Sequence, residues 1–150
     1  MTKFEEYLDA LSEAIDYDIE PAEMGSHVII IDEDIQVQFR EDDYGTQITL
    51  FCIVAPSLPK GISYQDAEDL VDMGGGPFYG APGLGRLPIV GSMILYHVLP
   101  YTRTDKEKFI ESVNEFIDLS REYFDKFAEM GDDEEDEDDE DDDFDEDSDE

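Results

Sequence analysis

The side chains that most often carry nucleophilic or metal chemistry are scarce in this sequence: His27, His97 and Cys52. The two histidines lie far apart and neither belongs to a recognisable motif, so no nucleophile–base arrangement can be identified. Paired His and Cys ligands at zinc-site spacing are also lacking. We therefore expect the histidines to be structural and Cys52 to be a buried thiol. A single cysteine cannot form an internal disulfide, which fits a reducing compartment.

Carboxylates are the most abundant charged groups: 43 Asp and Glu stand against nine Lys and Arg, for a formal net charge of -34. The acidic runs lack the glycine and the alternation of an EF-hand loop, and no carboxylate pair stands out as an acid–base couple. The glycine-rich segment 74–85 contains no known phosphate-binding signature, so we interpret it as a connector. The sequence predicts a protein that is not an enzyme and needs neither cofactor, ATP nor metal.

The negative charge is concentrated at the C-terminal end. Seventeen of the nineteen residues in Asp132–Glu150 are Asp or Glu, which leaves 26 acids and nine bases, a net of -17, in residues 1–131. Such a surface repels phosphates and anionic lipids, so nucleic acids and membranes are disfavoured as partners and a basic partner is favoured. Because the terminal segment has almost nothing apolar to bury, we expect a folded domain over 1–131 and a disordered tail over 132–150.

A cytoplasmic location is expected from two further features. No apolar run approaches the roughly 20 residues needed to span a bilayer. The N-terminal residues are acidic and amphipathic, unlike a secretory signal.

The segment Thr46–Ala55 is the most continuously apolar part of the chain. Ile48, Leu50, Cys52 and Val54 alternate along one face, and the other face is polar only in its first half. β-Branched and aromatic residues on both faces are typical of a strand with material packed on each side. We therefore predict a central strand, with helices covering one face of its sheet.

The remaining elements follow from periodicity and capping signals. A capping box and helical spacing predict a first helix from about Phe4. Similar signals predict a short second helix over residues 64–73. Alternation predicts strands at His27–Asp32 and Ile35–Glu41, and two more at Arg86–Val90 and Ser92–Pro100. A long helix should run from Asp105 to Met130, capped at Gly131. The fold class is α+β: an antiparallel five-stranded sheet with helices, in the order α-β-β-β-α-β-β-α, plus a disordered acidic C-terminal tail.

This order of elements resembles the class I type III secretion chaperones, the CesT/SycE-like family. The resemblance covers about Phe4 to Phe127. Its most characteristic part is Gly91–Pro100, a strand ending in Leu-Pro, followed by the long amphipathic helix. YbjN-like proteins share a similar architecture without a secretion role. An acidic chaperone for basic proteins is a further alternative, suggested by charge alone.

The resemblance implies a homodimer that holds the N-terminal segment of a secreted effector protein in extended form. The family's two-fold interface lies at the second helix and a nearby strand, which corresponds here to Leu70, Val71, Met73, Phe51 and Ile53. Effector segments wrap over apolar patches of the first helix and of the antiparallel meander that we expect the three consecutive strands 27–32, 35–41 and 46–55 to form. The matching residues are Leu8, Leu11, Val28, Ile30, Val37 and Phe39. For at least half of them, a place in the monomer's own core is the better explanation.

Overall fold

The computed structural model describes residues 2–148, and the side chains of residues 2–130 except Met24. Three α-helices accompany one antiparallel sheet of six strands, in the order β1-β2-β3-β4-β6-β5. The elements are α1 (Lys3–Ala14), β1 (Ile19–Pro21), β2 (His27–Ile31), β3 (Ile35–Glu41), β4 (Gln47–Ala55), α2 (Tyr64–Gly74), β5 (Gly83–Arg86), β6 (Met93–Pro100) and α3 (Lys106–Ser148), with short 3-10 helices at Glu23–Gly25, Gly76–Tyr79 and Tyr101–Arg103.

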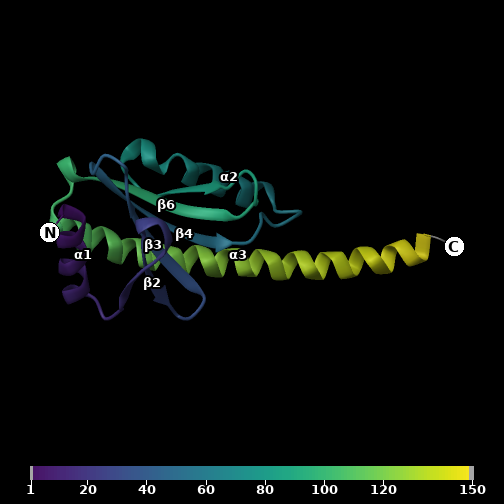
Figure 1. The fold of residues 1–150 in the computed structure, drawn as a ribbon. Helices are drawn as coiled ribbons and strands as arrows, with labels where there is room; N and C mark the ends of the chain where they lie inside the picture. The colour runs from purple at the N-terminus through teal and green to yellow at the C-terminus, as the bar shows by residue number, and fades with distance from the viewer. Residues whose placement is uncertain (1, 149–150) are drawn as a thin grey trace.

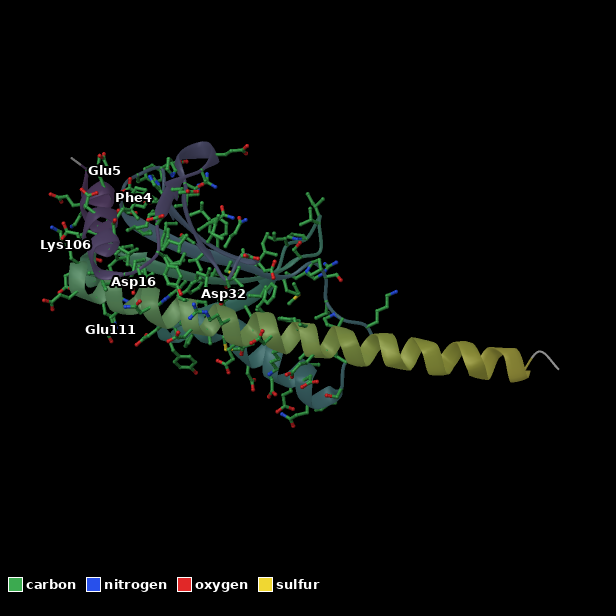
Figure 2. All side chains as sticks on the ribbon, turned by 90° about the horizontal axis from the view of Figure 1, so that it is seen from below. Phe4, Glu5, Asp16, Asp32, Lys106 and Glu111 are labelled. Carbon is green, nitrogen blue, oxygen red and sulfur yellow. The ribbon has the colours of Figure 1, made fainter. Side chains whose placement is uncertain are left out.

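The prediction of an α+β domain is confirmed, and so is the meander of β2, β3 and β4. β4 is central, since it pairs with β3 on one side and with β6 on the other. The buried side chains of the sheet face α3, which runs along one face of the sheet and continues beyond it (Figure 1). In Figure 2, seen from below, α1 lies across the N-terminal end of α3. There the Tyr7 ring packs against Phe109 with ring centroids 5.5 Å apart.

The prediction of five strands is wrong, because the described sheet contains six. The additional strand is β1, which pairs Ile19 with Ile29 and Pro21 with His27. Three residues are too few to show an alternating pattern, and Pro21 argues against a strand in sequence terms. At a sheet edge, however, proline is tolerated because its missing N–H costs no ladder hydrogen bond.

The strand predicted at Arg86–Val90 lies earlier, at Gly83–Arg86. The glycine-rich segment is therefore more than a connector. β5 pairs Gly83 with Tyr96 of β6. A Cβ on Gly83 would lie 2.6 Å from Cδ of Pro77 and 3.2 Å from Cζ of Tyr96, so only glycine fits between these two rings. Close approach of a neighbouring side chain is a typical reason for glycine in a strand.

The ends of α3 differ from prediction. The Lys108 amide donates to Oδ1 of Asp105 (2.8 Å), while Thr104 is buried and its carbonyl accepts a 2.6 Å hydrogen bond from the Tyr7 hydroxyl. The backbone of α3 continues through Gly131, where a cap was predicted, to Ser148. Side chains from residue 131 onward lie outside the described set, and disorder of 132–150 in solution stays a prediction.

Candidate partner-binding surface

Four of the six predicted partner-binding residues are in the hydrophobic core. Leu8 and Leu11 of α1, and Val37 and Phe39 of β3, are all buried. The Phe39 ring faces Phe109 of α3, with centroids 6.3 Å apart. These residues do not form a surface in the folded monomer. Their helical and alternating patterns indicate a face that is buried by something. The sequence pattern would be the same if that face were covered by α3 or by a partner protein.

The other two predicted residues, Val28 and Ile30, lie on the opposite side of the sheet. We call this side the open face, and it consists of the residues of β2, β3, β4 and β6 that alternate away from α3. Its members are Val28, Ile30, Gln36, Gln38, Arg40, Thr49, Phe51, Ile53, Ile94, Tyr96 and Val98. None of them is buried, and Ile30 is 47% exposed.

The open face is almost free of charge. Arg40 is its single ionisable member apart from Tyr96, although residues 1–131 carry a net of -17. Phe51 lies opposite Tyr96 and Ile53 opposite Ile94 across the β4–β6 pair, which forms an apolar strip in the middle of the sheet. Such a contiguous exposed apolar surface on a folded domain indicates an interaction site.

The predicted dimer residues are divided between two places. Phe51 and Ile53 belong to the open face. On α2, Leu70 is buried against the core, Met73 is half-buried and Val71 is 76% exposed. α2 itself lies against β5 (Figure 1). Val71 therefore points away from the domain, as an interface residue on this helix should.

Sequence reasoning missed three exposed aromatic residues near Val71. Tyr64 is seven positions before Val71 and so lies on the same side of α2. Phe78 and Tyr79 follow directly in the 3-10 helix, with ring centroids 5.3 Å apart. Each of the three aromatic side chains is at least 84% exposed. We call these four residues the α2 patch. The signal was present as two adjacent aromatics in a glycine-rich segment, but that segment was interpreted as a connector.

The histidines and the cysteine have packing roles. His97 Nε2 lies 3.2 Å from the Gly80 carbonyl, and burial lowers the pKa of the His97 imidazole. His27 packs edge-on to Phe4, with ring centroids 5.4 Å apart. Cys52 is buried, and that burial raises the pKa of its thiol. Within the part of the chain that the structure describes, no three His, Cys, Asp or Glu side chains are grouped to hold a metal ion.

Arg121 joins three elements at the surface of the domain. Its Nε donates to Oδ2 of Asp32 in the β2–β3 turn (2.9 Å), and its Nη2 donates to the Tyr17 hydroxyl after α1. These interactions raise the pKa of the Arg121 guanidinium, with the hydrogen bond to Asp32 as the main cause. The contact joins the β2–β3 turn to α3.

Comparisons with known proteins identify the fold. No protein-family model matches this sequence, and no curated protein is significantly similar to it. The Yersinia pestis type III secretion chaperone SycH, solved with a stable fragment of YscM2, aligns with a TM-score of 0.59 and 14% identity over 81% of this chain and 99% of its own.

Two further solved complexes contain the same fold. SchA from the HopA1–SchA chaperone–effector complex aligns with a TM-score of 0.65 and 18% identity, over 81% of this chain and 93% of its own. ExsC from the ExsC–ExsE complex gives 0.61 and 13%, over 85% and 97%. The chain thus has the fold of the type III secretion chaperones, and the predicted resemblance is confirmed. Among the described residues, no helix is long and apolar enough to cross a membrane.

Proposed function

We propose that this protein is a non-enzymatic chaperone that binds the N-terminal segment of a secreted effector protein and keeps it extended. The observation that carries the proposal is the shared fold, over at least 81% of the chain, with chaperones solved together with protein partners. The chain's own contribution is an open sheet face that is apolar and nearly uncharged. A cytoplasmic location suits such a role, since the effector is held before secretion.

The open face supports binding through apolar contacts. Val28, Ile30, Phe51 and Ile53 are exposed or half-buried on it. Burying apolar area contributes roughly 25 cal/mol per Å² before ordering costs, so an extended segment laid over this face can bind tightly without ion pairs. An extended chain also offers backbone hydrogen bonds to a sheet edge. Of the six predicted partner-binding residues, the surface includes Val28 and Ile30. It excludes the four that are buried in the core: Leu8, Leu11, Val37 and Phe39.

We further propose that the protein is a homodimer that associates through the α2 patch. Val71, Phe78 and Tyr79 are exposed, so packing within the domain does not account for these large apolar side chains. Two-fold association is the commonest way for such a patch to be covered, because it meets its own copy. Leu70 supports α2 from the core side, and Met73 lies at the margin.

The function is tested by co-expressing the full chain with the N-terminal segment of a secreted protein encoded beside its gene. We expect co-purification and protection of that segment from proteolysis. Ile30→Asp should reduce the yield of complex, while Ile89→Asp, at a 98% exposed turn residue, serves as the matched control. Equal yields from both variants, or no co-purification with any neighbouring secreted protein, would argue for a YbjN-like binding protein instead.

Salt dependence separates this function from that of an acidic chaperone for basic proteins, which the net charge of -34 favours. With apolar binding, raising salt from about 50 to about 150 mM should slow association several-fold and leave dissociation nearly unchanged. Stopped-flow and surface-binding kinetics measure the two rates. An affinity that collapses with salt through faster dissociation points to the acidic alternative.

A further inference from the structure

The strands β3 and β4 separate at the end of the sheet where β4 finishes. Their described register ends at Val37 opposite Cys52, although β3 begins at Ile35 and β4 continues to Ala55. The backbones of Ile35–Gln36 and Ile53–Ala55 are therefore not paired with each other in this register. Two strands that diverge in this way leave room between them, and a hollow lies there.

A groove begins at this separation. Its first part is a hollow of about 360 Å³, with Gln36 and Ile53 on its walls, Asp34 at the β2–β3 turn and Phe124 of α3 also lining it. Its second part is a hollow of about 270 Å³ between the loop after β4 and α3, lined by Pro59, Phe127 and Ala128. The two hollows share Val54, Ala55, Pro56 and Phe124 in their linings and so lie next to each other; together we call them the end groove.

The end groove is apolar in its second part and acidic around it. Ala128 is exposed and Phe124 half-buried. Asp34 lines the first part, and Asp125 and Glu129 are exposed next to Phe124 and Ala128 on α3. The two bases of this part of α3 are engaged elsewhere, Arg121 with Asp32 and Lys126 with Asp69 at 4.0 Å. Lys60 is the base in the loop on the other side, beyond Pro59.

The sequence that follows the groove residues of α3 adds further negative charge. α3 passes out of the groove at Ala128, and the chain then carries 17 acids in its last nineteen residues. Any partner of this chain therefore associates with a strongly negative protein. Complementary charge steers association and selects among partners.

We propose that the end groove binds an extended segment in which apolar residues alternate with Lys or Arg. In an extended chain, alternate side chains point to opposite sides. One set would occupy the apolar lining at Phe124 and Ala128, and the basic set would face Asp34, which lines the first part of the groove. This inference deepens the proposed function, on which it rests for the partner being an extended chain.

The test uses three labelled synthetic peptides of about 10 residues, which is a typical span for one extended segment. They alternate Leu with Lys, Ser with Lys, and Leu with Glu. Binding to the full chain is followed by fluorescence anisotropy at about 150 mM salt, where exposed charges more than about 8 Å apart are screened. The Leu/Lys peptide should bind at least tenfold more tightly than either of the others. Equal binding of the Ser/Lys peptide would overturn the proposal, because acidity alone would then suffice.

Two matched pairs of variants locate the site. Ala128→Arg places bulk and positive charge in the groove, and Ala14→Arg makes the same change at another exposed helical alanine, on α1. Ala128→Arg should weaken the Leu/Lys peptide at least tenfold, and Ala14→Arg by less than about twofold. Ile53→Ser, paired with Ile89→Ser at the exposed turn before β6, repeats the comparison without a charge change and without altering α3. Circular dichroism melting curves verify that each variant is folded.

Equal effects within both pairs would overturn the end groove as the binding site. Retained binding of a co-purifying effector segment by Ala128→Arg would also overturn it, and would leave the proposed function intact. A different result would contradict the proposed function: the Leu/Lys peptide binds the unmodified chain, but no secreted segment co-purifies with it. The two results are therefore distinguishable.

Discussion

At the scale of single residues, burial separates side chains that hold the domain together from those that are available to a partner. Phe39 and Phe78 illustrate the contrast, since one is fully buried and the other is 87% exposed. Phe39 lies on the α3 side of β3, where it meets Phe109. Phe78 lies in the α2 patch, where it meets Tyr79 and solvent.

Truncation of Phe39 should therefore destabilise the protein strongly. We expect Phe39→Ala to reduce the free energy of unfolding by about 3–5 kcal/mol, because it removes a ring from the core and leaves a cavity. Phe78→Ala should change it by less than about 0.5 kcal/mol, as is usual for exposed positions. Urea denaturation followed by circular dichroism measures both. A stable Phe39→Ala variant would mean that Phe39 is not a core residue.

His97 should make stability depend on pH between neutral and mildly acidic conditions. Its pKa in the folded state is lowered, mainly by burial, so the unfolded chain binds the proton more readily. Stability from this site is complete above the unfolded pKa of about 6.5 and is lost as the pH falls toward the folded value. The Gly80 carbonyl and Glu115 oppose the shift, while Lys108 adds to it.

The measurement compares the free energies of unfolding of the wild type and His97→Gln from pH about 7.5 down to about 5.5. Glutamine retains an N–H that can donate to the Gly80 carbonyl, but it does not titrate. The wild type should lose more stability than the variant over this range. Parallel curves would show that His97 is not the group responsible.

At the scale of elements, α2 is distinguished by the apolar side chains on its outer side, which are exposed rather than packed against the domain. Leu70 anchors it, whereas Tyr64 and Val71 point away from the body. Asp69 of α2 lies 4.0 Å from Lys126 of α3, so this side of α2 faces α3. The side with Tyr64 and Val71 is the one that the proposed homodimer would cover.

Val71→Asp should therefore convert the dimer into a monomer without unfolding it. A charge buried at a two-fold interface meets its own copy, and both the repulsion and the desolvation oppose association. Sedimentation equilibrium of the full chain at tens of micromolar distinguishes the two states. Ile89→Asp provides the same change at an exposed position outside the α2 patch and should remain dimeric. A wild-type monomer would remove the dimer from the proposed function.

At the scale of the whole molecule, charge is the dominant feature. Asp132–Glu150 contributes half of the net charge of -34, since residues 1–131 carry -17. Like charges at this density repel one another and oppose any compact arrangement of the segment. Among the residues whose side chains the structure describes, the last buried core member is Met130.

Deletion of 132–150 should accordingly leave the melting temperature unchanged or slightly raised, with the increase largest at low salt, where repulsion is least screened. Differential scanning calorimetry of the full and shortened chains measures the difference. A marked decrease in melting temperature would mean that the deleted residues bind to the domain, most plainly through its Lys or Arg side chains.

The sequence by itself determined the features that depend on local pattern. The amphipathic helices, the meander and the alternation of β4 follow from periodicity, and the acidity follows from composition. Short elements escaped this reasoning, because β1 has only three residues and β5 contains two glycines. Their strand character comes from pairing with β2 and β6, partners that a local window does not contain.

Only the tertiary structure decided which apolar faces are covered. Alternation separates two faces of a strand but does not say which one packs on a helix, so Val37 and Val28 were equal candidates until α3 covered the first and left the second only half-buried. The end groove also depends on tertiary structure, because it requires β3 and β4 to diverge where Phe124 of α3 passes beneath them. Burial is a property of neighbours brought together from distant positions, and those contacts exist only once the chain has folded.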